Sequence, residues 1–261
     1  QRVSTGMHYT SVANIMKLIE PLFLNELYEQ FEEAKGNEQK LNKLLHRLSN
    51  LKIFDPACGS GNFLIIAYKE LRRLEIEIIK ELGQISIYSS ITLENFYGIE
   101  IDDFSHEIAI LSLWLAKHQM SIEFHKEFKI SKPSLPLSET GNIIKGNACV
   151  VNWTDLCPKN NSHEIIIIGN PPYCGSSMQS LEQKKDMEIV LKEYPNYKNL
   201  DYVTCWFKIA SDFIVGSKSK FAFVSTNSIC QGEQIGLLWP KILTNNLEIF
   251  FAHQSFNWSN S

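Results

Sequence analysis

The sequence predicts an α/β protein with a doubly wound, mostly parallel sheet and an N-terminal helical segment. Short apolar runs alternate along its 261 residues with segments of helical periodicity, a pattern typical of a parallel sheet with helices on both faces. The run EIIIIG (164–169) carries four consecutive isoleucines, as expected of a strand buried on both faces.

The first fifty residues are expected to be helical. Ser11 is a suitable N-cap for the first helix, and Pro21 is expected to bend or restart that helix. A second amphipathic run, EQKLNKLLHRL (38–48), follows. The pattern then changes, so we expect a helical segment over residues 1–50 and the α/β domain over residues 51–261.

Beyond this segment, strands and helices are expected to alternate. The expected strands are at 51–55, 95–102, 142–147, 164–169, 220–226 and 247–253. The expected helices are at 61–83, 104–119, 201–214 and 232–244, the last with Pro240 near its middle. Ligands of such sheets bind outside the carboxyl ends of the strands. The side chains at those ends are therefore the candidates for a site: Asp55, Glu100, Asn147 and Asn170.

Composition narrows the classes of function. The formal net charge is −4, which disfavours binding of nucleic acid by charge alone, because that binding needs Lys and Arg against phosphates. The sequence lacks the run of ~18 apolar residues that a membrane span needs, so we expect a cytoplasmic protein. The six cysteines include no C-x-x-C pair, so we expect free thiols and no metal site. The chain starts with Gln, which suggests a piece of a longer protein.

A glycine-rich turn, DPACGSGNF (55–63), follows the first expected strand. Gly59 and Gly61 permit a tight turn and a close approach of the backbone to a ligand. Asp55 precedes the glycines, where it can bind a cationic group, and the third glycine of a pyrophosphate-binding turn is missing. Glu100 ends the next strand, about where an acid binds ribose hydroxyls in this class of fold. Together they indicate a nucleoside site, with an ordinary strand-to-helix turn as the alternative.

The strand at 164–169 ends in Asn170, Pro171, Pro172 and Tyr173. Prolines lack N–H donors and hold the preceding residue extended, so these residues should form a rigid loop with free carbonyl oxygens. The amide oxygen and a nearby main-chain carbonyl are two fixed acceptors, which suit the two hydrogens of a primary amine. The tyrosine ring can stack on a flat heterocycle. A simple proline turn that ends a strand is the alternative.

The segments DPACGSGNF, YGIEID and GNPPY resemble, in this order and spacing, motifs I, II and IV of S-adenosylmethionine-dependent DNA adenine-N6 methyltransferases. TGMHYTS (5–11) resembles their motif X, which makes the motif order similar to the gamma arrangement. Segments such as NPPYCGSSMQS look most like the MmeI-type (type IIG/IIL) restriction-modification enzymes. The resemblance implies a Rossmann-like class I methyltransferase fold and S-adenosylmethionine as cofactor.

The resemblance also implies which residues bind the cofactor. Glu100 would bind the ribose hydroxyls, Ile101 would pack on the cofactor's adenine, and Asn147 would accept from the adenine amino group. The full implied set is Tyr9, Thr10, Asp55, Ala57, Gly59, Gly61, Asn62, Phe63, Glu100, Ile101, Asn147 and Asn170.

The implied substrate is double-stranded DNA with an adenine flipped out of the helix. Asn170 and the Pro171 carbonyl would receive the N6 hydrogens of that adenine, Pro172 would stiffen the loop, and Tyr173 would stack on the base. Residues 51–261 would form the catalytic domain. A target recognition domain, with or without an endonuclease domain, would belong to the longer chain.

Two positions depart from the family pattern. Motif X often reads YYTP in relatives and here reads HYTS (8–11), and Asn147 stands where relatives often have Asp. A second aromatic that packs on the flipped base is expected beyond Ser261. A protein glutamine methyltransferase, an RNA amino methyltransferase, a cytosine-N4 methyltransferase and a catalytically silent DNA-binding subunit are the alternatives.

Overall fold

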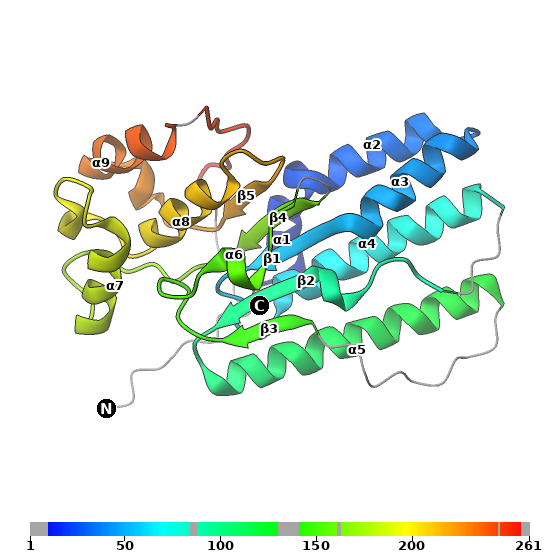
Figure 1. The fold of residues 1–261 in the computed structure, drawn as a ribbon, viewed down its shortest axis with the longest axis horizontal. Coiled ribbons are helices and arrows are strands. Elements are labelled where there is room, and N and C mark those ends of the chain that lie inside the picture. Colours follow the sequence, from blue (N-terminus) through cyan, green and yellow to red (C-terminus); the bar gives the residue numbers. More distant parts are fainter. Residues whose placement is uncertain (1–9, 84–87, 130–140, 161–162, 245, 257–261) are drawn as a thin grey trace.

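The computed structural model describes residues 10–83, 88–129, 141–160, 163–244 and 246–256. A five-stranded sheet in the order β3-β2-β1-β4-β5 forms its centre, and every neighbouring pair of strands is parallel. The strands are β1 (Leu51–Asp55), β2 (Phe96–Glu100), β3 (Asn142–Lys145), β4 (Glu164–Gly169) and β5 (Lys220–Phe223). Helices cover both faces, which confirms the predicted doubly wound fold (Figure 1).

The N-terminal part is helical, as predicted. Its helices are α1 (Val12–Ile19), α2 (Asn25–Ala34) and α3 (Glu38–Asn50). Helix α1 begins directly after Ser11. A π-helical turn at Glu20–Leu24 joins α1 to α2, and Pro21 lies in it. Because proline donates no N–H, the helical register shifts to this wider turn instead of continuing unchanged.

Two apolar cores lie on the two faces of the sheet. The first face is covered by α1, α2 and α3 together with α4 (Asn62–Glu81) and α5 (Asp103–Phe128). The second is covered by α6 (Trp153–Leu156), α7 (Leu181–Leu191), α8 (Thr204–Ile214) and α9 (Glu233–Ile242). In β4, Ile166 and Ile168 enter the first core, whereas Ile165 and Ile167 enter the second. Successive side chains of a strand point to opposite faces, so four consecutive isoleucines serve both cores.

Several boundaries differ from the prediction. Helix α5 continues to Phe128, well past the predicted end at residue 119, and α8 begins at Thr204 instead of residue 201. Helices α6 and α7 were not predicted. Short 3₁₀ turns complete the described elements, at Leu93–Asn95, Tyr197–Asn199 and Asn227–Cys230.

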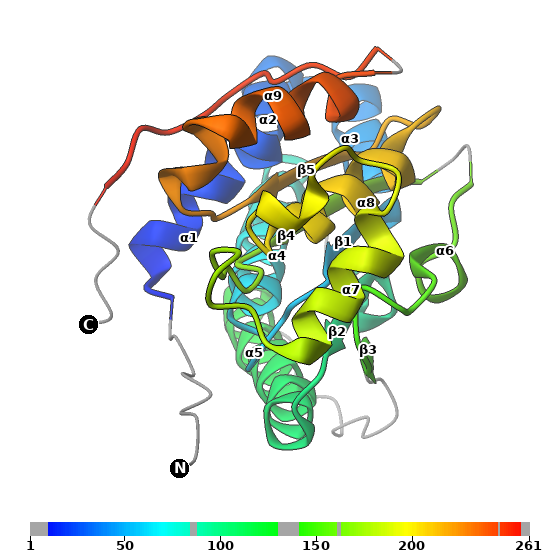
Figure 2. The same ribbon diagram turned by 90° about the vertical axis from the view of Figure 1, so that its left-hand side faces the viewer.

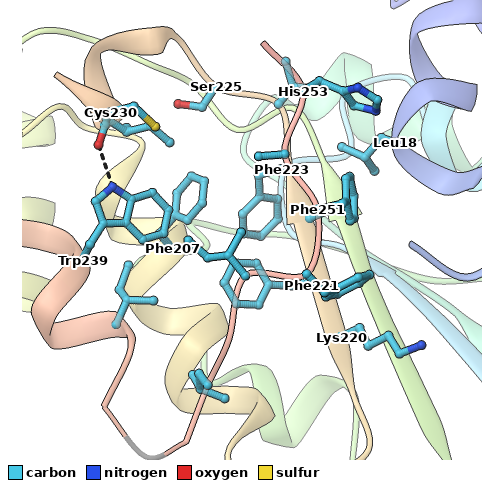
Figure 3. A pocket seen from close by; sticks show the side chains of 18 of the residues that line it. Leu18, Phe207, Lys220, Phe221, Phe223, Ser225, Cys230, Trp239, Phe251 and His253 are labelled. Atoms are coloured by element: carbon cyan, nitrogen blue, oxygen red, sulfur yellow. Dashed lines mark hydrogen bonds between the residues drawn. The ribbon is translucent and has the colours of Figure 1, made fainter. Parts of the chain in front are cut away.

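The sixth strand predicted at 247–253 is wrong. This segment has no strand pairing and lines an apolar groove together with β5 (Figure 3). The segment is held against α1 instead, since Nε2 of His253 lies 2.8 Å from the Lys17 carbonyl oxygen.

Three further expectations from composition concern the cysteines, membrane spans and metal ligands. All six cysteines are free, as predicted. No helix within the described ranges is both long and apolar enough to cross a bilayer. In the same part of the chain, no three His, Cys, Asp or Glu side chains gather as metal ligands would.

The two central strands end against each other. Asp55 is the last residue of β1 and Gly169 the last of β4, and these two strands pair in parallel. A Cβ atom at Gly169 would lie 2.5 Å from Asp55 Oδ1, so glycine is required by the close approach of the carboxyl. On the second face of the sheet, Trp206 of α8 donates its Nε1–H to the Pro56 carbonyl at 3.1 Å and fixes the turn after β1.

We expect Gly169→Ala to lower the free energy of unfolding by about 1–3 kcal/mol, because its methyl group overlaps the Asp55 carboxyl. Urea denaturation measures the change. Gly175→Ala is the matched control, since a Cβ there meets no atom within 4 Å. Equal stabilities of the two variants would contradict the close approach.

Candidate functional site

The four side chains predicted at strand ends lie along one edge of the sheet. Because the strands are parallel, their carboxyl ends point the same way, to the left in Figure 1 and toward the viewer in Figure 2. Asp55 and Glu100 end β1 and β2, while Asn147 and Asn170 closely follow β3 and β4. The fold thus brings side chains that are far apart in the sequence to one edge.

The glycine turn after β1 is built against Glu100. Gly59 and Gly61 have φ angles of 53° and 85°, which residues with side chains rarely adopt. A Cβ at Gly61 would also lie 3.3 Å from Cα of Ala109 in α5. Glu100 accepts from the Gly59 N–H through Oε2 and from the Asp102 N–H through Oε1, each at 2.8 Å. A carboxylate oxygen has two lone pairs, so each Glu100 oxygen can accept one more hydrogen bond.

The Asp55 carboxyl is fully buried. Its Oδ1 accepts from the Ala57 N–H at 3.0 Å, but its buried Oδ2 accepts no hydrogen bond from the described residues. Burial raises the pKa of Asp55 from 3.8 to about 8, the Ala57 N–H opposes this rise, and the charge of Glu100 adds to it. A buried acceptor without a donor is costly unless a ligand supplies one. Asp55 therefore marks a place for a cationic or hydrogen-bond-donating group.

Asn170 carries a second buried acceptor at the neighbouring strand end. Its amide oxygen Oδ1 is shielded from solvent and accepts no hydrogen bond within the described part of the chain. Pro171 is buried, whereas Pro172 and Tyr173 are exposed, with 40% of Tyr173 accessible. The loop therefore combines an inward amide oxygen with an accessible aromatic ring.

Residues that the sequence analysis missed hold this loop in place. Asp201, only 4% exposed, accepts from the N–H groups of Cys174 at 2.9 Å and Val203 at 3.1 Å. Gln179 donates to the carbonyl oxygens of Cys174 and Leu200 at 3.1 and 2.9 Å. An acid just before a helix is a recognisable start signal and could have identified Asp201. No comparable local signal marks Gln179, whose partners depend on the fold.

The remaining predicted cofactor residues surround the glycine turn. Asn62 and Phe63 begin α4 directly after it, and Phe63 is buried. Ile101 follows β2 and is 68% exposed, which is unusual for an isoleucine. Thr10 is buried just before α1, and α1 packs against α4. Tyr9 lies outside the described residues.

A large apolar groove of about 1560 Å³ lies apart from most of these residues. It runs between β5, α9 and residues 246–256, and aromatic side chains dominate the walls drawn in Figure 3. Tyr173 borders it, but Asp55, Glu100 and Asn170 do not. The unpaired acceptors at the strand ends, rather than the groove, therefore locate the polar site.

Comparison with known proteins identifies the relatives of this chain. The family model described as the DNA-methyltransferase domain of MmeI matches residues 31–261. DNA methyltransferase A of Bacillus subtilis is 49% identical in a match of 261 residues, gaps included, that covers 98% of this chain and 30% of that protein. A type II restriction enzyme and methyltransferase of Escherichia coli, Eco57I, is 27% identical over 58% of this chain and 17% of its own length.

A solved structure supports the same relationship. The type IIL restriction-modification enzyme MmeI, solved in complex with DNA, matches with a TM-score of 0.91 and 43% identity. The match covers 97% of this chain and 35% of the MmeI chain. The chain therefore spans about a third of the length of MmeI and of the Bacillus protein.

The raised pKa of Asp55 predicts a pH-dependent stability. Because the folded chain binds this proton more tightly than the unfolded chain, stability falls as the pH rises from about 4 to about 8. Asp55→Asn lacks this loss. The difference in unfolding free energy between Asp55→Asn and the unmodified chain should therefore shift in favour of the variant as the pH rises from about 4 to about 8. The shift should be up to about 1.4 kcal/mol per pH unit.

Urea denaturation at several pH values measures this difference. Asp155→Asn, at an exposed position of α6, is the control for removal of a carboxylate. A stability difference for Asp55→Asn that does not change with pH would contradict the raised pKa.

Proposed function

Since the chain belongs to the MmeI DNA-methyltransferase domain family, we propose that it methylates the N6 amine of an adenine flipped out of double-stranded DNA, with S-adenosylmethionine as donor. It would act within a restriction-modification enzyme that also carries a target recognition domain. One observation carries the proposal: two buried acceptors, Asp55 Oδ2 and Asn170 Oδ1, lie at the ends of paired strands and receive no donor from the described residues.

The ends of β1 and β2 fit S-adenosylmethionine. The buried carboxyl of Asp55 suits the cationic methionine end, because its Oδ2 needs a donor. Glu100 suits the ribose hydroxyls, because each of its carboxylate oxygens accepts one N–H and keeps a lone pair for a hydroxyl. Ile101 offers an exposed apolar surface to the flat adenine. When bound, the cofactor supplies an electrophilic methyl group and retains the electron pair of the broken carbon–sulfur bond.

The carboxyl end of β4 and the loop that follows it suit the target amine. The N6 lone pair of adenine is delocalised into the ring, so the amine is a poor nucleophile. Asn170 Oδ1 and the Pro171 carbonyl accept its two hydrogens, which favours a tetrahedral nitrogen with a localised lone pair. One N6 proton is lost to water on transfer, because an amide oxygen is too weak a base to retain it. Positioning and electrostatics therefore carry the catalysis, with Tyr173 stacked on the base.

The direct test uses the full-length protein that contains this chain. It is incubated with methyl-labelled S-adenosylmethionine and, in parallel, with DNA, RNA or bulk protein. We expect the label in DNA, recovered as N6-methyladenine after digestion to nucleosides. Label as N4-methylcytosine, or label only in RNA or protein, would contradict the proposal.

The role of Asn170 can be separated from a structural one. Asn170→Ala should lower the rate of transfer by about 100-fold or more, because it removes one of the two acceptors for N6. The dissociation constant for S-adenosylmethionine, measured by calorimetry, should change little. Asn25→Ala, at an exposed position of α2, is the control and should retain full activity. Loss of cofactor binding in Asn170→Ala would instead indicate a residue that holds the cofactor or the fold, and not an acceptor for the target amine.

A further inference from the structure

A buried hydrogen-bond network lies behind the Asn147 amide. The side-chain nitrogen Nδ2 of Asn147 donates to Asp186 Oδ1 at 2.9 Å, and its oxygen Oδ1 accepts from the Cys149 N–H at 2.9 Å. Asp186 is 7% exposed and lies on α7, which stands beyond the strand ends in Figures 1 and 2. Its other oxygen, Oδ2, accepts from the Tyr202 hydroxyl at 2.6 Å.

This network permits one orientation of the amide. A rotation by 180° would set Nδ2 against the Cys149 N–H and Oδ1 against the Asp186 carboxylate, so that like groups would face each other. Tyr202 remains a donor, because burial, with contributions from Cys149 and Asp186, raises the pKa of its hydroxyl. The amide oxygen is therefore fixed beside Cys149 and keeps a second lone pair for a ligand.

The orientation matters because the two ends of an amide are chemically opposite. The oxygen accepts from an exocyclic amine of a purine, whereas the nitrogen donates to the carbonyl of a 6-oxopurine. A carboxylate at this position would present acceptors at both ends and would need no such control. An asparagine needs a partner that decides which end faces the ligand.

We propose that Asp186 is a positioning residue that holds the Asn147 oxygen toward the cofactor's purine, so that the site selects a 6-aminopurine over a 6-oxopurine. This inference rests on the proposed function, in which the cofactor lies at the ends of β1 and β2, and on the family resemblance, which implies that Asn147 accepts from the cofactor's amino group. Asp186 acts through Asn147 and through no contact of its own with the ligand.

The two residues can be exchanged to test this role. Asp186→Asn alone offers one acceptor in place of two, so Asn147 Nδ2 and the Tyr202 hydroxyl compete for it and the Asn147 amide loses its fixed orientation. In the double variant Asn147→Asp with Asp186→Asn, the new amide accepts from Tyr202 and donates to the new carboxylate. That carboxylate still accepts from the Cys149 N–H, and it still presents an acceptor to the ligand. Every donor of the network therefore keeps a partner.

The measurement is the ratio of dissociation constants for S-adenosylhomocysteine and its deaminated analogue S-inosylhomocysteine, on the full-length protein by calorimetry. The unmodified protein should prefer the 6-amino ligand. Asp186→Asn should reduce this preference about tenfold, the effect of one misplaced hydrogen bond, and the double variant should restore it to within about threefold. Glu188→Gln, at an exposed position of the same helix, is the control and should leave the ratio unchanged.

Asn147→Ala gives a second comparison that leaves the Asp186–Tyr202 bond in place, and it should reduce the preference to a similar extent. An unchanged ratio in Asp186→Asn or Asn147→Ala, even with a lower melting temperature, would overturn the inference. So would a double variant that binds S-adenosylhomocysteine but does not regain the preference. If the unmodified protein binds neither ligand, the proposed function fails, and this inference with it.

Discussion

The site depends on one buried carboxyl at the junction of the two central strands. Asp55 ends β1 with one donor among the described residues, the Ala57 N–H, and its carboxyl lies so close to Gly169 that a side chain there would overlap it. The last residue of β4 must therefore be glycine, and the next residue, Asn170, begins its loop beside the carboxyl. The glycine turn and the proline loop, which look like separate motifs in the sequence, are two parts of one packing arrangement.

The sheet edge is divided between two groups of residues that meet at this junction. Glu100 and Asn147 lie at the ends of β2 and β3, and each is already oriented by hydrogen bonds from the chain. Tyr173 lies beyond β4, where Asp201 and its neighbours fix the loop. This division suits a reaction in which one ligand donates a group to another, because each ligand has its own oriented side chains.

The sequence predicted most of the sheet and much of the candidate site for the same physical reason. In a parallel sheet the strands are apolar and their carboxyl ends share an edge, so the strand pattern also indicates where polar side chains meet. Partners distant in the sequence were missed, as with Asp186 and Gln179, because no local pattern specifies them. The segment 247–253 has the composition of a strand, but composition does not supply a neighbouring strand. The segment lines a groove together with β5, and its His253 contacts the Lys17 carbonyl of α1 instead of a strand.

Buried polar atoms without a hydrogen bond show which side chains at this edge are available to a ligand and which only hold the fold together. In folded proteins nearly all buried polar atoms are paired, so each exception needs an explanation. Five buried side-chain nitrogen or oxygen atoms in the described residues lack a hydrogen bond. The Arg72 nitrogen among them is ion-paired with a glutamate, and the atoms of His163 and Ser219 lie just before β4 and β5, at the opposite edge. The other two, on Asp55 and Asn170, lie at the ends of adjacent strands at the carboxyl edge, where none of the described residues donates to them. Both oxygens are therefore open to donors from ligands, as the proposed reaction requires.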